Sequence, residues 1–206
     1  KNGVDASDRK GPASVILAGI IAPFVIKRAF ILCFCMAVIT SSYLIARAGI
    51  PVLIIGILSI ISGVAYTAGP KPLSHLGLGD IFVLIFFGPV AVAGTYFIQS
   101  FECNGAVIAS GLSAGFLSVA ILTVNNLRDI HTDRRAGKKT LAVRFGKNFA
   151  QREYIFCIIA ACLIPGGIFL ITHKHPLILM SSFVFIILSP AIQTVLTSGD
   201  GDKLNK

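Results

Sequence analysis

Six long runs of residues without Asp, Glu, Lys or Arg constrain this chain more than any other feature. They are residues 29–46, 48–66, 81–101, 103–127, 154–172 and 176–199. A helix needs about 20 mainly apolar residues to cross roughly 30 Å of bilayer hydrocarbon. Hydrophobic residues make up 55% of the chain and charged residues 13%, which excludes an ordinary soluble domain. The sequence therefore predicts an all-α, multi-span transmembrane helix bundle with six spans.

A shorter uncharged run, residues 11–26, precedes the first predicted span and is interrupted by Pro12, Gly19 and Pro23. We expect it to lie at the membrane surface or to lead into the next helix, and not to cross the bilayer. Because the chain begins at Lys1 and ends soon after the last run, we interpret residues 1–206 as a single integral-membrane domain truncated at both ends.

The positive charges divide unequally between the two sides that six spans create. Of the 18 Lys and Arg residues, all but Arg47 and Lys174 fall in segments 1–28, 67–80, 125–153 and 200–206, which share one side. The positive-inside rule places that side in the cytoplasm. The sequence thus predicts an integral membrane protein with its aspartate-rich loops facing the cytoplasm, and the family resemblance given below implies a bacterial plasma (inner) membrane. We expect the lipid bilayer, and no nucleic acid, as the macromolecular environment of these bases.

One stretch, NNLRDIHTDRRAGKKTLAVRFG, gathers both acids and bases on the predicted cytoplasmic side; it is residues 125–146, here called the motif loop. Asn125, Asp129 and Asp133 are spaced four apart, so a continuing helix would align them on one face. Two carboxylates one turn apart repel each other unless a cation offsets them. Mg²⁺ prefers such oxygen ligands together with substrate phosphate oxygens.

The bases of the motif loop could hold that phosphate. Arg128, Arg134, Lys138, Lys139 and Arg144 are candidates to neutralise a diphosphate. The alternative is that the two acids are solvated loop residues paired with neighbouring arginines, and that the bases only orient the protein and touch anionic lipid. A second mixed stretch, KNGVDASDRKGP at residues 1–12, repeats the chemistry on the same predicted side and favours a shared site.

These stretches resemble a known family. The motif loop is similar to the second aspartate-rich motif of the UbiA superfamily of intramembrane prenyltransferases, and KNGVDASDRKGP is similar to the end of its first motif. YTAGPKPLSHLGLGDIFVLIFFG, residues 66–88, resembles the branch that prenylates 1,4-dihydroxy-2-naphthoate for menaquinone synthesis. The first motif's usual Asn-Asp-x-x-Asp would lie before Lys1, and only Asp5 matches it. Since the family has about nine helices, we expect this fragment alone to be inactive.

The resemblance implies an enzyme that joins a polyprenyl diphosphate to 1,4-dihydroxy-2-naphthoate, with Mg²⁺ as cofactor and loss of diphosphate and CO2. It implies that Asp129, Asp133 and Asp5 ligate the metal and that Asn125 supports catalysis. The diphosphate would be bound by Asn126, Arg128, Lys138, Lys139 and Arg144. Tyr66 and Lys71 would line the pocket of the aromatic acceptor, although a tyrosine at a span end is often only an interfacial anchor.

Two other functions stay open at this point. The same motifs serve prenyltransferases that use 4-hydroxybenzoate or a chlorophyll-type ring, so the acceptor depends on residues 66–88 alone. A transporter is the non-enzymatic alternative, but transporters place ionisable groups near the middle of the membrane, and the predicted spans carry none.

Small residues indicate where two of the helices approach each other. Gly111 and Gly115 form a small-xxx-small pair that permits close packing of helix backbones. We expect this pair to pack the helix that leads into the motif loop against a neighbour inside the bundle. Dimerisation through the same face is the alternative.

Overall fold

The structure, a computed structural model, describes residues 21–67, 72–174 and 176–197. Within these ranges the chain forms helices and no strand. In order they are α1 (Pro23–Ala48), α2 (Ile50–Thr67), the 3₁₀ turn η2 (Leu73–His75), α3 (Gly79–Ile85), the π-helical turn η3 (Phe86–Val90), α4 (Ala91–Ser100), α5 (Gly105–Arg128), α6 (Ile130–Arg135), α7 (Leu141–Phe145), α8 (Lys147–Thr172), the 3₁₀ segment η4 (Pro176–Phe183) and α9 (Val184–Thr197).

The all-α, multi-span prediction is confirmed. Five helices are long and apolar enough to cross a membrane, and a shorter apolar helix, Ile50–Tyr66, accompanies them. The long ones are Phe24–Ala48, Gly79–Ser100, Gly105–Arg128, Lys147–Thr172 and Pro176–Thr197. Each predicted run corresponds to one of these six helices, and the chain is an integral membrane protein.

The predicted boundaries are wrong at several helix starts, because charged residues extend the helices beyond the uncharged runs. α1 starts at Pro23 and carries Lys27 and Arg28, so the end of the predicted 11–26 surface segment belongs to the first span. Residues 11–20 of that segment lie outside the described residues. α3 includes Asp80, and α8 begins at Lys147, before the predicted start at residue 154.

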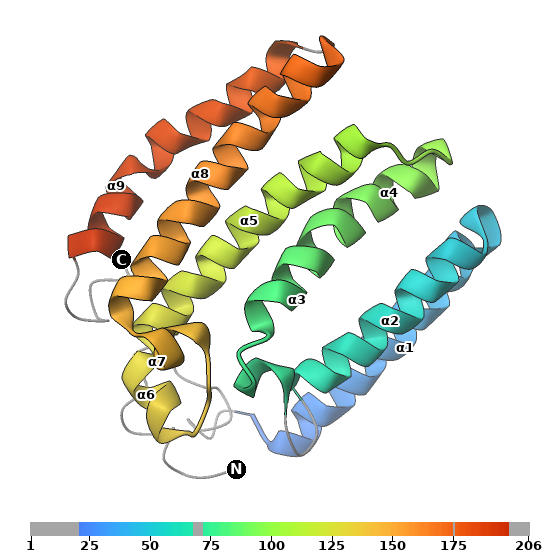
Figure 1. The fold of residues 1–206 in the computed structure, drawn as a ribbon. Coiled ribbons are helices and arrows are strands. Elements are labelled where there is room, and N and C mark those ends of the chain that lie inside the picture. The colour runs from blue at the N-terminus through green and yellow to red at the C-terminus, as the bar shows by residue number, and fades with distance from the viewer. Residues whose placement is uncertain (1–20, 68–71, 175, 198–206) are drawn as a thin grey trace.

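Successive helices alternate in direction, and short connections join them at the two ends of the bundle (Figure 1). α1 and α2 are separated only by Gly49, whose φ of +76° is unfavourable for a residue with a side chain. The α1–α2, α4–α5 and α8–η4 connections lie at one end, here called the far end. α6 and α7 lie at the opposite end, here called the motif end, with the end of α2 and the start of α3.

The helices stand side by side in a curved row, with α5 and α8 at the centre of the packing (Figure 1). Their shared core contains Val119, Ala120, Tyr154, Cys157 and Ile158. The hydroxyl of Ser113 donates to the carbonyl of Ala161 over 2.7 Å and links the two backbones. Gln151 of α8 similarly donates to the carbonyl of Val195 in α9 over 2.8 Å.

The small-residue pair on α5 packs against the kinked helix beside it, as expected. Pro89 lies in η3, where a proline lacks the N–H of a regular helix, and Gly88 has the non-helical dihedrals φ −101° and ψ −112°. A Cβ on Gly111 would lie 2.7 Å from the Cα of Pro89, and one on Gly115 would lie 3.1 Å from the Cα of Gly88. The glycines therefore let α5 touch the backbone of η3 directly.

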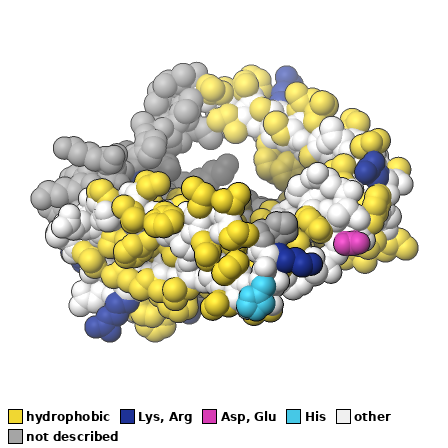
Figure 2. Space-filling model, turned by 90° about the horizontal axis from the view of Figure 1, so that it is seen from above, with side chains coloured by type: hydrophobic (Ala, Val, Ile, Leu, Met, Phe, Trp, Pro, Cys, Tyr) yellow, Lys and Arg dark blue, Asp and Glu magenta, His cyan; other side chains and the backbone are white. Residues whose placement is uncertain are grey.

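The far end of the bundle carries few charges. Figure 2 shows it from above as a mainly hydrophobic surface around a hollow, with only scattered basic and acidic side chains. Within the described residues, the bases of the motif loop are all at the other end, as the alternation of the helices requires. The predicted grouping of the charged loops on one side is therefore confirmed for the part of the chain that the structure describes.

Candidate functional site at the motif end of the bundle

The motif loop begins as a direct continuation of α5. α5 ends at Arg128, Asp129 bends the chain with φ −94° and ψ 11°, and α6 follows. The N–H of Asp129 still donates to the carbonyl of Asn125 over 3.0 Å, and that of Asp133 to the carbonyl of Asp129 over 2.8 Å. The three residues thus remain linked by helical hydrogen bonds between positions four apart. A single continuous helix does not run through them, because Asp129 separates α5 from α6.

Both acids of the loop are paired with bases from the same loop. The Arg128 guanidinium donates two hydrogen bonds to the Asp129 carboxylate, from Nε to Oδ1 at 2.9 Å and from Nη2 to Oδ2 at 2.8 Å. The Lys138 ammonium lies 2.7 Å from Oδ1 of Asp133, which is buried. Arg128 and Lys138 offset the two like charges in this arrangement. Such paired groups can exchange partners when a multivalent cation and a phosphate arrive together.

Lys139 and Arg144 of the motif loop bind the segment between α2 and α3. The N–H of Lys139 donates to the carbonyl of His75 over 2.8 Å, and the Arg144 guanidinium donates to the carbonyl of Leu76 over 2.7 Å. Gly77, with φ +73°, faces the carbonyl of Lys139 so closely that a Cβ would overlap it. These contacts join residues 72–78, here called the 72–78 loop, to the motif loop. The two segments that resemble the family therefore form one unit.

Arg144 and Lys139 have structural contacts in addition to their predicted role. The exposed Arg144 donates from its guanidinium to a backbone carbonyl of the 72–78 loop. Lys139 donates to another carbonyl of that loop from its backbone N–H. Asn125 is exposed in the last turns of α5, and Asn126 is partly exposed beside it. Asp5 and Lys71 lie outside the described residues. The structure thus gathers Arg128, Asp129, Asp133 and Lys138 into one cluster, with the remaining described candidates around it.

Tyr66 lies in the last turn of α2, next to the start of α3. A Cβ on Gly79 would be 3.2 Å from the Tyr66 hydroxyl oxygen, and the charges of Asp80 and Lys138 both act on this tyrosine. Tyr66 therefore lies against the start of α3. Lys138, which pairs with Asp133, interacts electrostatically with Tyr66.

Sequence reasoning missed Asp80 and Glu153. Asp80 is buried at the start of α3, and its charge acts on Glu153 in α8. Both acids immediately precede an uncharged run, so the runs alone assigned them to loops. For Asp80, the signal that could have found it is that an acid is favourable in the first turn of a helix, which extends α3 backwards over it. Glu153 lies beyond the first turn of α8, so this signal does not apply to it. Both lie near the motif end and not in the middle of a span, so the argument against a transporter is unchanged.

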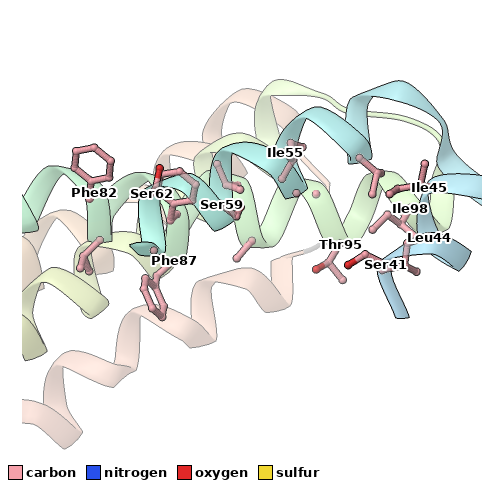
Figure 3. A pocket seen from close by; sticks show the side chains of 18 of the residues that line it. Ser41, Leu44, Ile45, Ile55, Ser59, Ser62, Phe82, Phe87, Thr95 and Ile98 are labelled. Carbon is pink, nitrogen blue, oxygen red and sulfur yellow. The ribbon is translucent and has the colours of Figure 1, made fainter. Parts of the chain in front are cut away.

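An elongated apolar cavity of about 770 Å³ runs away from Tyr66 between α1, α2 and the α3–α4 helix. Figure 3 shows side chains along it, with Phe82, Ser62 and Phe87 toward one end and Leu44, Ile45 and Ile98 toward the other. Among the described residues that line it, the polar side chains besides Tyr66 are all hydroxyls: Ser41, Ser59, Ser62 and Thr95. A cavity of this composition suits a hydrocarbon chain better than a charged solute.

The donors of the cluster suit a divalent cation that is shared with a phosphate. Asp129 and Asp133 provide the hard carboxylate oxygens that Mg²⁺ prefers, and Mg²⁺ typically takes one or two protein carboxylates together with substrate oxygens. Three or more His, Cys, Asp or Glu side chains do not come together as a metal cage anywhere in the described ranges. The residues therefore fit a substrate-bridged metal ion better than a metal held by protein alone.

Comparison with known proteins agrees with this chemistry. The profile of the UbiA prenyltransferase family matches residues 4–205 of the chain. The chain is 36% identical over 196 residues to 1,4-dihydroxy-2-naphthoate octaprenyltransferase of Escherichia coli, covering 92% of this chain and 62% of that protein. It is 40% identical over 157 residues to the Haemophilus influenzae protein of the same name, covering 71% and 49% respectively.

A related protein with another acceptor also matches. The 2-carboxy-1,4-naphthoquinone phytyltransferase of Synechocystis is 30% identical over 118 residues, covering 57% of this chain and 38% of that protein. The chain thus spans between roughly two fifths and three fifths of the length of these relatives. No solved structure matches the chain significantly.

Proposed function

Because the chain belongs to the UbiA prenyltransferase family, we propose that the full-length protein transfers a polyprenyl group from an allylic polyprenyl diphosphate to 1,4-dihydroxy-2-naphthoate. The observation that carries this proposal is the contact between two segments. The motif loop, which carries the acid–base cluster, contacts the 72–78 loop through Lys139 and Arg144, and Tyr66 lines an apolar cavity. A charged head and a long hydrocarbon tail would therefore find their complementary surfaces next to each other.

The diphosphate would bind at the cluster. Asp129 and Asp133 would hold Mg²⁺, with Asp5 as a further ligand, and Arg128 and Lys138 would turn from these carboxylates to the phosphate oxygens. Members of this family generally depend on a divalent metal ion. When bound, the metal ion supplies positive charge that stabilises the departing diphosphate. Asn125, Asn126, Lys139 and Arg144 surround this place and would complete the polar rim.

The bond changes balance without an added oxidant. The allylic C–O bond breaks and its electron pair leaves with the diphosphate. The electron-rich ring supplies the pair for the new C–C bond, and the carboxylate of the acceptor leaves as CO2, which returns an electron pair to the ring. Water would capture the allylic cation, and the apolar walls of the cavity around Phe82 and Phe87 exclude it.

The position in the membrane follows from the charge distribution. We propose that the motif end faces the cytoplasm of a bacterial plasma membrane, because the Lys and Arg residues of the described ranges, other than Arg47 and Lys174, lie toward that end. Single cysteines at the exposed positions Lys139 and Lys174, in a variant without native cysteines, test this. An impermeant maleimide added to intact cells should label the Lys174→Cys protein and spare the Lys139→Cys protein. Labelling of the opposite pair of sites would contradict the proposal.

Acceptor competition tests the function. Membranes that contain the full-length protein receive a labelled allylic diphosphate, Mg²⁺ and equal amounts of 1,4-dihydroxy-2-naphthoate and 4-hydroxybenzoate. The proposal predicts Mg²⁺-dependent transfer to the naphthoate with release of CO2. Transfer to 4-hydroxybenzoate alone would overturn the acceptor assignment, and no transfer to either would overturn the proposed reaction.

A further inference from the structure

Asp80 is a buried carboxylate that the cluster described above does not use. It is 7% exposed, and its Oδ1 atom has no hydrogen-bond partner in the described part of the chain. A buried carboxylate oxygen without a donor is unfavourable, because it has lost its water without replacement. Such an atom in a functional region indicates a group that meets its partner only when the substrate is bound.

The charge of Asp80 acts on Tyr66 of α2 and on Glu153 and Cys157 of α8, and Lys138 of the motif loop acts on Tyr66. Of these, Tyr66 is the one that also lines the apolar cavity. Its hydroxyl oxygen is 3.2 Å from where a Cβ of Gly79, the residue before Asp80, would lie. Tyr66 therefore borders both the cavity and the start of α3, where the buried carboxylate lies.

We propose that Tyr66 and Asp80 form a proton-accepting pair for a ring hydroxyl of the aromatic acceptor. This inference rests on the proposed prenyl transfer and identifies the side of the cavity where the acceptor ring lies. The ring enters the end of the cavity at Tyr66, where its hydroxyl donates to the tyrosine oxygen. Among the described residues Tyr66 lines the cavity and Asp80 does not, so Asp80 acts as the positioning partner of Tyr66.

The proton transfer balances with the bond changes. As the ring attacks the allylic carbon, its hydroxyl proton passes to the Tyr66 oxygen, and the Tyr66 proton passes to Oδ1 of Asp80. The ring is then a neutral ketone at that position. When CO2 leaves, its electron pair restores the aromatic ring, and the two protons move back. Asp80 and Tyr66 therefore end the cycle as they began, and no other base is needed.

The pair makes a prediction about acceptors that a merely structural role would not make. The monomethyl ethers of 1,4-dihydroxy-2-naphthoate keep the ring but lack one or the other hydroxyl proton. The full-length wild-type protein should use the parent acceptor at least tenfold better, in kcat/KM, than one of these two ethers. In Asp80→Asn and Tyr66→Phe this preference should fall to threefold or less. The KM for the allylic diphosphate should stay within twofold, because the cluster that binds it is intact.

Further variants separate the pair from its surroundings. The losses in kcat from Asp80→Asn and Tyr66→Phe should not add in the double variant, since both break the same route. Asp80→Glu should recover part of the preference for the hydroxylated acceptor. Glu153→Gln is the matched control, because it removes the neighbouring acid of α8 and should retain the full preference.

Each outcome either supports or overturns the proposed Tyr66–Asp80 pair. An Asp80→Asn or Tyr66→Phe protein that keeps the wild-type preference would overturn the proposal, and so would additive losses. If Asp80→Asn does not accumulate as folded protein, Tyr66→Phe decides alone, because it keeps the packing of the ring. Absence of naphthoate transfer by the wild-type protein is a different result, because it would refute the proposed function itself.

Discussion

The backbone N–H of Lys139 donates a hydrogen bond to the carbonyl of His75 over 2.8 Å, although the two residues are far apart in the sequence. With the Arg144 guanidinium on the carbonyl of Leu76, this bond holds the 72–78 loop on the motif loop. The segment that would choose the acceptor is therefore fixed directly to the segment that would bind the diphosphate. A change in this contact should affect both.

Gly77 and Gly137 offer a matched test of this contact. Both have positive φ, +73° and +72°, but a Cβ on Gly77 would overlap the carbonyl of Lys139, whereas one on Gly137 would meet nothing within 4 Å. We expect Gly137→Ala to lower the free energy of unfolding by about 1–2 kcal/mol, the cost of the backbone conformation. Gly77→Ala should cost clearly more. Thermal unfolding in detergent measures both, and equal losses would contradict the close packing.

The glycine contact between α5 and η3 should be equally sensitive to added volume. A Cβ on Gly111 would lie 2.7 Å from Pro89, and the backbone cannot yield cheaply there. Gly111→Ala should therefore lower stability by about 1–3 kcal/mol. Gly167→Ala, in the middle of α8 with open space around its Cβ position, is the control and should be neutral or mildly stabilising. The same thermal unfolding measurement compares them. A Gly111→Ala protein as stable as the control would mean that the helices are farther apart.

Two single-charge variants distinguish the phosphate-binding bases from the structural ones. Lys138 pairs with Asp133 in the cluster, whereas Arg144 holds the 72–78 loop. Lys138→Gln should raise the KM for the allylic diphosphate about tenfold, which corresponds to about 1.4 kcal/mol for one charge-assisted contact. Arg144→Gln should lower stability and leave that KM within about threefold. Steady-state kinetics with varied diphosphate decides, and the reverse pattern would exchange the two roles.

The cavity beside Tyr66 should set which hydrocarbon tails are accepted. Gly94 lines it, and a Cβ there would meet nothing within 4 Å, so a larger side chain would project into open space. Gly94→Leu should favour shorter prenyl diphosphates over longer ones by about tenfold relative to the wild-type protein, if a few methylene contacts are lost. Gly167→Leu, outside the cavity, should not change the preference. Competition between diphosphates of two lengths is the measurement. An unchanged preference in Gly94→Leu would place the tail elsewhere.

The number of helices and the location of the charges could be predicted because uncharged runs and basic loops are properties of the sequence alone. Helix starts could not, since Asp80 and Lys147 continue their helices through charged residues that the run lengths exclude. The sequence predicted that acids and bases of the motif loop lie in one place, but not that Asp133 pairs with Lys138. The hydrogen bond from Arg144 to the carbonyl of Leu76 joins residues 68 positions apart, so local sequence patterns could not predict it.

The burial of Asp80 also could not be predicted from the sequence, because it depends on tertiary packing. Its place next to the apolar run after Gly79 indicates a loop, and the tertiary packing of α3, mainly against α5, removes the carboxylate from solvent. The same limit applies to Gly88, whose close approach to Gly115 depends on the kink at Pro89. Glycines 111 and 115 could be singled out by spacing, but their partner could not.

The central claim is that the acids of the motif loop bind a divalent metal together with a diphosphate. Mn²⁺ can replace Mg²⁺ and is detected by electron paramagnetic resonance, and an unreactive allylic thiolodiphosphate can replace the substrate. In the full-length protein we predict Mn²⁺ binding that strengthens at least tenfold with this analogue. It should be lost in the Asp129→Asn, Asp133→Asn double variant and retained in Glu102→Gln, a far-end control. Unchanged Mn²⁺ binding by the double variant would contradict the account.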